Sequence, residues 1–166
     1  EVFDERWRER VTGRRKSMNP EKKDDAEASA EKLGARERAA LARENDPMTL
    51  AALIRGLGTV SDPGTAQAVV DQLPRDHALV RETAYVALFN IKDPATLDAA
   101  WKYGLAHTEP MARAYVAQLC AARAVAAAVP QLRKQLADAN WHARAEAAYA
   151  LGTLRWFDHD PRHRLF

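Results

Sequence analysis

The chain has 166 residues, of which 47% are hydrophobic, 7% are aromatic and 34 are alanine. This length allows one domain with a sizeable core, but the core must be built by close packing of small side chains. The formal net charge of +2 excludes a molecule that is polycationic as a whole, and no segment has the roughly 20 apolar residues of a membrane-spanning helix.

Residues 1–47 are predicted to form a charged extension. It opens with a basic arm, in which six cationic residues and one acidic residue, Glu9, give residues 6–16 a charge of +5. The cationic residues are Arg6, Arg8, Arg10, Arg14, Arg15 and Lys16. Asn19 and Pro20 then indicate the N-cap and first residue of a helix from about 20 to 44.

Two roles suit the basic arm. It grips nucleic acid or an anionic membrane face, or it docks on an acidic partner or stays solvated as an exposed helix. Trp7 is the single aromatic residue among residues 6–16, and no base-reading module accompanies it, which favours the second role.

Residues 48–166 contain a repeated segment. Its copies are 80–88, 112–120 and 143–151, and their arginines Arg81, Arg113 and Arg144 are 32 and 31 residues apart. A fixed period of this length is typical of a solenoid, whose small units bury their apolar faces on one another. Because alanine favours helix and no segment alternates like a strand, we predict an all-α fold, an α-solenoid of about four helix pairs. The predicted units are about 48–73, 74–105, 106–136 and 137–166.

The repeat register also aligns residues outside the three copies. Asp62-Pro63 and Asp93-Pro94 fall at equivalent places and predict helix starts, with Asp as the cap. Cys120 takes the place of Leu88, which predicts a small core residue. Apolar residues recur on one face of the second helices. These predicted core residues are Ala66, Val69, Leu73, Leu97, Ala100, Gly104, Val129, Leu132 and Leu136.

The fourth unit departs from the pattern after about residue 154. Residues 155–166 either cap the array with aromatic side chains or belong to a further repeat. His159 and His163 have the i, i+4 spacing of metal ligands on a helix, but Pro161 lies between them. We therefore predict no metal site there.

The segment from Asp138 to Gly152, DANWHARAEAAYALG, resembles HEAT repeats of the short bacterial type, known as PBS-lyase-like HEAT repeats. The resemblance extends over residues 48–154 and implies a superhelix of paired helices. The first unit departs from it, with Leu50 where the arginine should be. For function the resemblance is unspecific, because such repeats occur in scaffolds, adaptor subunits, bilin lyases and a few enzymes.

The resemblance implies a structural ladder for Arg81, Arg113 and Arg144. In these repeats the arginine typically pairs with an acidic or amide group at the turn between units. A partly buried guanidinium needs such a partner. The nearby groups are Asp76, Glu109, Asp138 and Asn140.

The predicted protein-contact surface lies on the second helices, along the concave face of the solenoid. Trp101 occupies a position where the next unit has Arg133, so we expect it to be partly open to water. The alternative is that Trp101 packs between two units. With its neighbours it forms a set rich in the residue types that anchor interfaces. The set is Asp98, Trp101, Lys102, Tyr103, Arg133 and Lys134.

No catalytic motif is present in the sequence. There is no Gly-rich phosphate loop, nucleophile elbow or HExxH motif. The His-Glu dipeptide that the similar metal-dependent HEAT hydroxylases need is also absent. We predict a non-catalytic scaffold or accessory subunit of a larger complex, without a cofactor, which binds other protein subunits through the concave face and the basic arm.

Two alternatives remain open at this point. One is a bilin-lyase-like or other small-ligand protein that uses the inner groove and Trp101. The other is a HEAT-like nucleic-acid-binding protein, which the mixed charge of the second helices disfavours. Because the sequence begins at Glu1 rather than Met, the compartment is cytoplasmic by default and periplasmic if a signal segment has been removed.

Overall fold

The computed structural model describes residues 32, 34–59 and 62–159, and its internal contacts divide the chain after Lys32. Among the described residues all regular structure is helical and there is no strand, so the all-α prediction is confirmed for this part. Within the same ranges, no helix combines the length and the hydropathy that crossing a bilayer requires.

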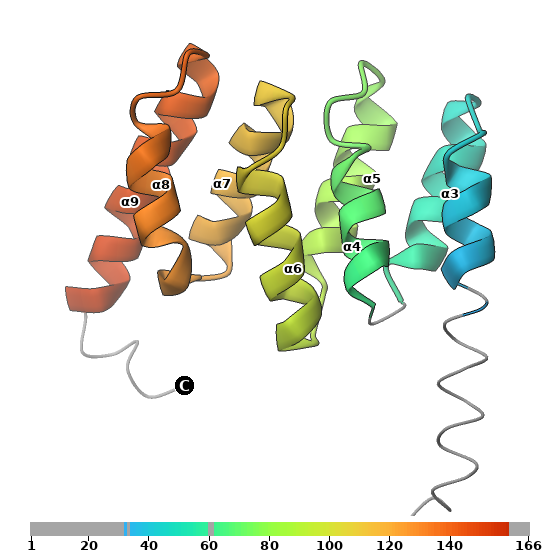
Figure 1. Cartoon of the computed structure of the whole chain (residues 1–166), viewed down its shortest axis with the longest axis horizontal. Helices are drawn as coiled ribbons and strands as arrows, with labels where there is room; N and C mark the ends of the chain where they lie inside the picture. Colours follow the sequence, from blue (N-terminus) through green and yellow to red (C-terminus); the bar gives the residue numbers. More distant parts are fainter. Residues whose placement is uncertain (1–31, 33, 60–61, 160–166) are drawn as a thin grey trace, which may run out of the picture. The chain divides into compact units, whose positions relative to one another are not determined.

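The helices of the unit that begins at Leu33 lie in two rows (Figure 1). The rear row consists of α3 (Pro47–Leu57), α5 (Ala78–Phe89), α7 (Pro110–Ala122) and α9 (Trp141–His159), which contact one another in that order. The front row consists of the helix at 34–41, drawn in blue, followed by α4 (Pro63–Val70), α6 (Pro94–Leu105) and α8 (Val129–Gln135). A short 3-10 helix, η1 (Ala126–Ala128), precedes α8.

Each later front-row helix packs on the rear-row helix that follows it in sequence. These pairs are α4 with α5, α6 with α7 and α8 with α9, whereas α3 and α4, which the predicted first unit joins, touch less. The helix at 34–41 approaches α3 and α4 from the other side. Leu41 is buried in the core, and Arg38 Nη1 donates to the Asp62 carboxylate and, at 2.9 Å, to the Thr65 hydroxyl. The helix at 34–41 therefore belongs to the same compact unit as α3 and α4.

Three helices begin with the same four-residue pattern, Asp-Pro-x-Thr. An Oδ2 atom of Asp46, Asp62 and Asp93 accepts the backbone N–H three residues further on, at 2.8, 2.8 and 2.7 Å. The threonine hydroxyl donates to the same oxygen in each case. Proline suits the first helical position because its missing N–H is not needed there. The predicted caps at Asp62 and Asp93 are confirmed, and Asp46 adds a third that the repeat register did not single out.

The core is built from leucine and valine with alanine at the closest contacts. Most of the predicted core residues are buried, with Leu97 and Val129 partly so. The prediction is wrong for Leu136, which was expected in the core but has 46% of its surface exposed. The cause is the length of α8, which has seven residues and ends before Leu136, so this side chain lies past the helix as its C-cap. Cys120 is fully buried, and its burial raises the pKa of the thiol to about 12.

Candidate functional site

The repeated arginines hold the tight turns between paired helices. Nη1 of Arg81 donates to the backbone carbonyls of the residues six and five positions before it, at 2.9 Å each. Arg113 and Arg144 do the same at 2.8 and 2.8 Å, and at 2.7 and 2.9 Å. The Nη1 partners at all three turns are therefore backbone carbonyls, and only Arg113 also binds one of the acidic side chains that the sequence suggested, Asp138. These contacts close the turns, and each of the three Nη1 groups uses its hydrogen bonds within the chain.

Arg113 makes an additional contact to the next pair of helices. Its Nε and Nη2 atoms bind the two carboxylate oxygens of Asp138, at 2.7 and 2.8 Å. Both side chains are largely buried, and the geometry is the two-pronged form that gives a guanidinium–carboxylate pair its strength. This hydrogen bonding lowers the pKa of Asp138 below its usual value of 3.8.

We expect Arg113→Met to destabilise the fold near neutral pH, by an amount that shrinks in acid. A carboxyl whose pKa is lowered by folding contributes stability above its unfolded pKa, and that contribution is lost as the pH falls through the folded pKa. Urea unfolding at about pH 7 and about pH 3 measures the difference between variant and wild type on either side of the usual Asp pKa. Arg133→Met, at an exposed arginine, is the matched control and should show no such pH dependence. A difference for Arg113→Met that is equal at both pH values would contradict this assignment.

Only some of the residues predicted to form the contact surface on the front row are exposed together. Lys102 forms an ion pair with Asp98 and lies 5.6 Å from the centre of the Trp101 ring. The Tyr103 hydroxyl donates to Asp71 at 2.7 Å, which ties the end of α6 to the end of α4. Arg133 and Lys134 are exposed on α8.

Trp101 does not belong to an exposed surface. Only 8% of its surface is accessible, so the expectation that it is partly open to water is wrong. The indole lies in the main core, and the ammonium of Lys102 lies over its ring. Arg133 at the equivalent position did not indicate exposure of Trp101, because a long arginine can reach solvent from a site where an indole cannot. The small-ligand alternative loses the residue on which it depended.

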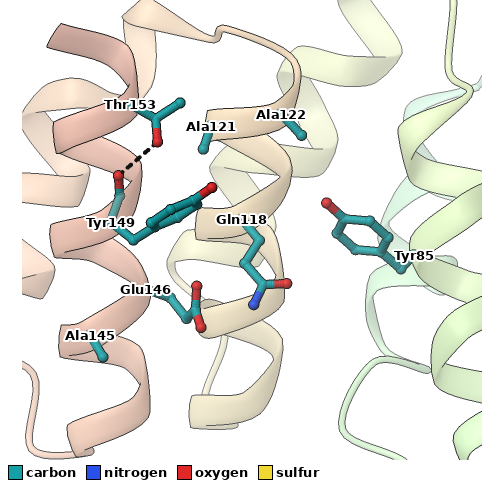
Figure 2. A pocket seen from close by; sticks show the side chains of 8 residues that line it. All are labelled: Tyr85, Gln118, Ala121, Ala122, Ala145, Glu146, Tyr149 and Thr153. Atoms are coloured by element: carbon teal, nitrogen blue, oxygen red, sulfur yellow. Dashed lines mark hydrogen bonds between the residues drawn. The ribbon is translucent and has the colours of Figure 1, made fainter. Parts of the chain in front are cut away.

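A groove lies on the rear row instead (Figure 2). It has a volume of about 690 Å³ and spans three helices, with α7 between α5 and α9. Two of the three lining residues from α7 are alanine, whereas α5 and α9 contribute the two tyrosines. Its lining is Tyr85, Gln118, Ala121, Ala122, Ala145, Glu146, Tyr149 and Thr153.

The groove combines aromatic rings with a carboxylate. Figure 2 shows the Tyr149 ring reaching from α9 toward α7, with Tyr85 on the far wall and the Glu146 carboxylate one turn away. Tyr85 packs against Tyr115, with ring centres 6.2 Å apart. Partial burial, and then the negative charge of Glu146, raise the pKa of the Tyr85 hydroxyl. The electrostatic influence of Glu146 therefore extends across the groove.

A second groove of about 440 Å³ lies between α3 and α5 on the same row. Its lining includes Arg55, Glu82 and the exposed Val86. Because α5 lies between α3 and α7 in the rear row, the two grooves adjoin this helix on different sides.

The sequence interpretation did not identify Tyr85, Glu146 or Tyr149 as site residues. The sequence does contain a pattern that could have indicated them, because each repeated segment contains one tyrosine. These tyrosines stand three, five and two residues before the aligned Leu88, Cys120 and Leu151, so they point in different directions around their helices. Because the three tyrosines do not occupy equivalent positions, aligning the repeats does not single them out.

Other predicted features lie outside what the structure describes. The basic arm at residues 6–16 and His163 fall outside the described ranges, and the side chain of His159 is not described. Within those ranges, no group of three or more His, Cys, Asp or Glu side chains is placed to hold a metal ion.

The chain was also compared with known proteins. No protein family model matches it, and no curated protein is significantly similar to it in sequence.

Proposed function

We propose that this chain is a HEAT-like α-solenoid that acts as a protein-binding scaffold, with its rear row as the contact surface. Three observations support the solenoid: the alternation of helices between two rows, the arginine contacts that recur at spacings of 32 and 31 residues, and the resemblance of Asp138 to Gly152 to HEAT repeats. The front-row concave surface favoured by the sequence is replaced in this proposal by the opposite row.

The distribution of exposed apolar side chains carries the proposal. Six large apolar residues are exposed among those described, and five of them lie on rear-row helices. These five are Met48, Val86, Phe89, Trp141 and Tyr149. Tyr149 and Val86 line the two grooves, whereas the exposed residues of α6 and α8 include the charged Lys102, Arg133 and Lys134. Exposed apolar side chains that recur on one face are typical of surfaces that a partner covers.

The chemistry of the main groove suits binding rather than turnover. Its polar groups are one carboxylate, one amide and three hydroxyls, of which the Thr153 hydroxyl donates to the Tyr149 carbonyl at 3.0 Å. The single thiol, Cys120, is buried in the core and held in its neutral form at physiological pH.

Site-specific photocrosslinking tests the proposal. A photoreactive phenylalanine analogue at Phe89 or Tyr149 should form a discrete adduct in cells of the native host, because a partner covering the rear row would lie within reach. The same analogue at Arg133 or Lys134 is the matched control on the front row and should form none. Adducts confined to the front-row positions would restore the surface predicted from sequence, and adducts from neither row would contradict a scaffold role for both.

A further inference from the structure

Glu146 places one negative charge in the groove between α5, α7 and α9. Among the residues that the structure describes, no Lys or Arg lines this groove. Among the described residues, the ion-pair partner of Glu146 is His142, one turn earlier in α9, with Nε2 and Oε1 3.5 Å apart. That distance is too long for a hydrogen bond. The carboxylate side chain is only 19% exposed, so water screens it incompletely.

The surroundings of Glu146 suit a flat cation on an apolar stem. Tyr85 and Tyr149 come from opposite walls, and the negative face of a tyrosine ring attracts a cation, with arginine found there more often than lysine. Ala121, Ala122 and Ala145 offer methyl groups against which the methylenes of a long side chain can pack. A guanidinium can bind a carboxylate through two parallel hydrogen bonds while its plane stacks on an aromatic ring, which an ammonium cannot do.

We propose that the groove between α5, α7 and α9 binds an arginine side chain of a partner protein, with Glu146 as its counter-ion and Tyr85 and Tyr149 as its aromatic walls. The inference rests on the proposed scaffold function and names the chemistry of the partner. At about 690 Å³ the groove takes the arginine together with neighbouring residues, so the recognised element is a short segment in which arginine is flanked by small or apolar side chains.

Selection from a random peptide library displayed on phage tests the proposal without assuming a partner. The wild-type chain should enrich peptides that share an arginine. Glu146→Gln keeps the shape of the side chain but removes its charge, and it should weaken the selected peptides by roughly tenfold or more, as loss of a charge-assisted hydrogen bond does. Replacing the peptide arginine with citrulline, its uncharged analogue, should weaken binding to the wild type similarly but change little for Glu146→Gln.

Glu82→Gln is the matched control. It removes the same charge from the same row, but Glu82 lines the groove between α3 and α5. Its affinity for the selected peptides should equal that of the wild type. Tyr149→Ser, at a side chain that is 64% exposed, should weaken binding without changing the thermal unfolding temperature, which separates an aromatic contact from a folding defect.

Several results would overturn the arginine site. They are enrichment of peptides without a shared arginine, enrichment of none, binding that survives Glu146→Gln, or binding that is lost with Glu82→Gln. The crosslinking experiment distinguishes these from failure of the scaffold proposal. Peptides without arginine that still compete with the crosslink at Tyr149 would leave the rear row as a binding surface and remove only the proposed ligand chemistry.

Discussion

Leu119→Ala is expected to lower the free energy of unfolding by about 3 kcal/mol, within the usual range of about 2–5 kcal/mol for a buried leucine. Leu119 is fully buried and is among the largest side chains in the core. It belongs to α7, whose other buried residues are mostly alanine. Because such small side chains cannot move far enough to fill a cavity, the loss should include a substantial cavity contribution. Urea unfolding followed by circular dichroism measures the change.

Leu136→Ala is the matched control for this substitution. Leu136 is 46% exposed at the C-cap of α8, so the same change of atoms should alter stability by less than about 0.5 kcal/mol. Equal losses for the two variants would show that burial at α7 is not what stabilises the array.

Gly104→Ala should also destabilise the chain, by about 2 kcal/mol, although alanine favours a helix over glycine by about 1 kcal/mol. A Cβ atom at Gly104 would lie 3.0 Å from the Cβ of Val116 and closer still to one of its methyl groups. The glycine is therefore where α6 and α7 approach each other. Thermal and urea unfolding should both report the loss, and Val116→Ala combined with Gly104→Ala should recover part of it.

Gly152→Ala provides the control of opposite sign. Gly152 lies in α9, and a Cβ atom there would meet nothing within 4 Å, so only the gain in helix propensity remains. We expect stabilisation of up to about 1 kcal/mol. If Gly104→Ala stabilised the chain as Gly152→Ala does, the close contact between α6 and α7 would be disproved.

The repeat register gives a reason for this glycine. In the preceding unit the position equivalent to Gly104 is the buried Leu73, and the one equivalent to Val116 is the buried Ala84. The unit with Gly104 thus has the small residue on the front row and the larger one on the rear row, and the preceding unit has the reverse. Such an exchange keeps the total volume similar, which is what a closely packed core tolerates best.

Helix positions could be predicted from sequence because their causes are local. Asp62-Pro63 and Asp93-Pro94 define helix starts through their own backbone chemistry, and the structure has those caps. The repeated arginines each lie three residues after the first residue of α5, α7 or α9. The pairing of helices was harder, because both neighbours of a helix are equally near in sequence. Leu41 and Arg38 place the helix at 34–41 in the array, and neither stands in a repeated pattern.

The surface could not be predicted in the same way. Whether Trp101 or Tyr149 is exposed depends on how the adjacent helices pack, and a repeat position constrains that only loosely. Trp101 is buried in the core, while Tyr149 stands over a groove that exists because α7 contributes alanines where α5 and α9 contribute tyrosines. The groove depends on side chains from three helices together, so no single segment of the sequence predicts it.

The alanines that α7 contributes to the groove also affect how a partner would bind there. Ala121 and Ala122 have no side-chain rotamers, so neither changes conformation when a ligand contacts it. A ligand therefore incurs no side-chain reorganisation cost at these two residues, and selectivity depends on the lining side chains that can turn.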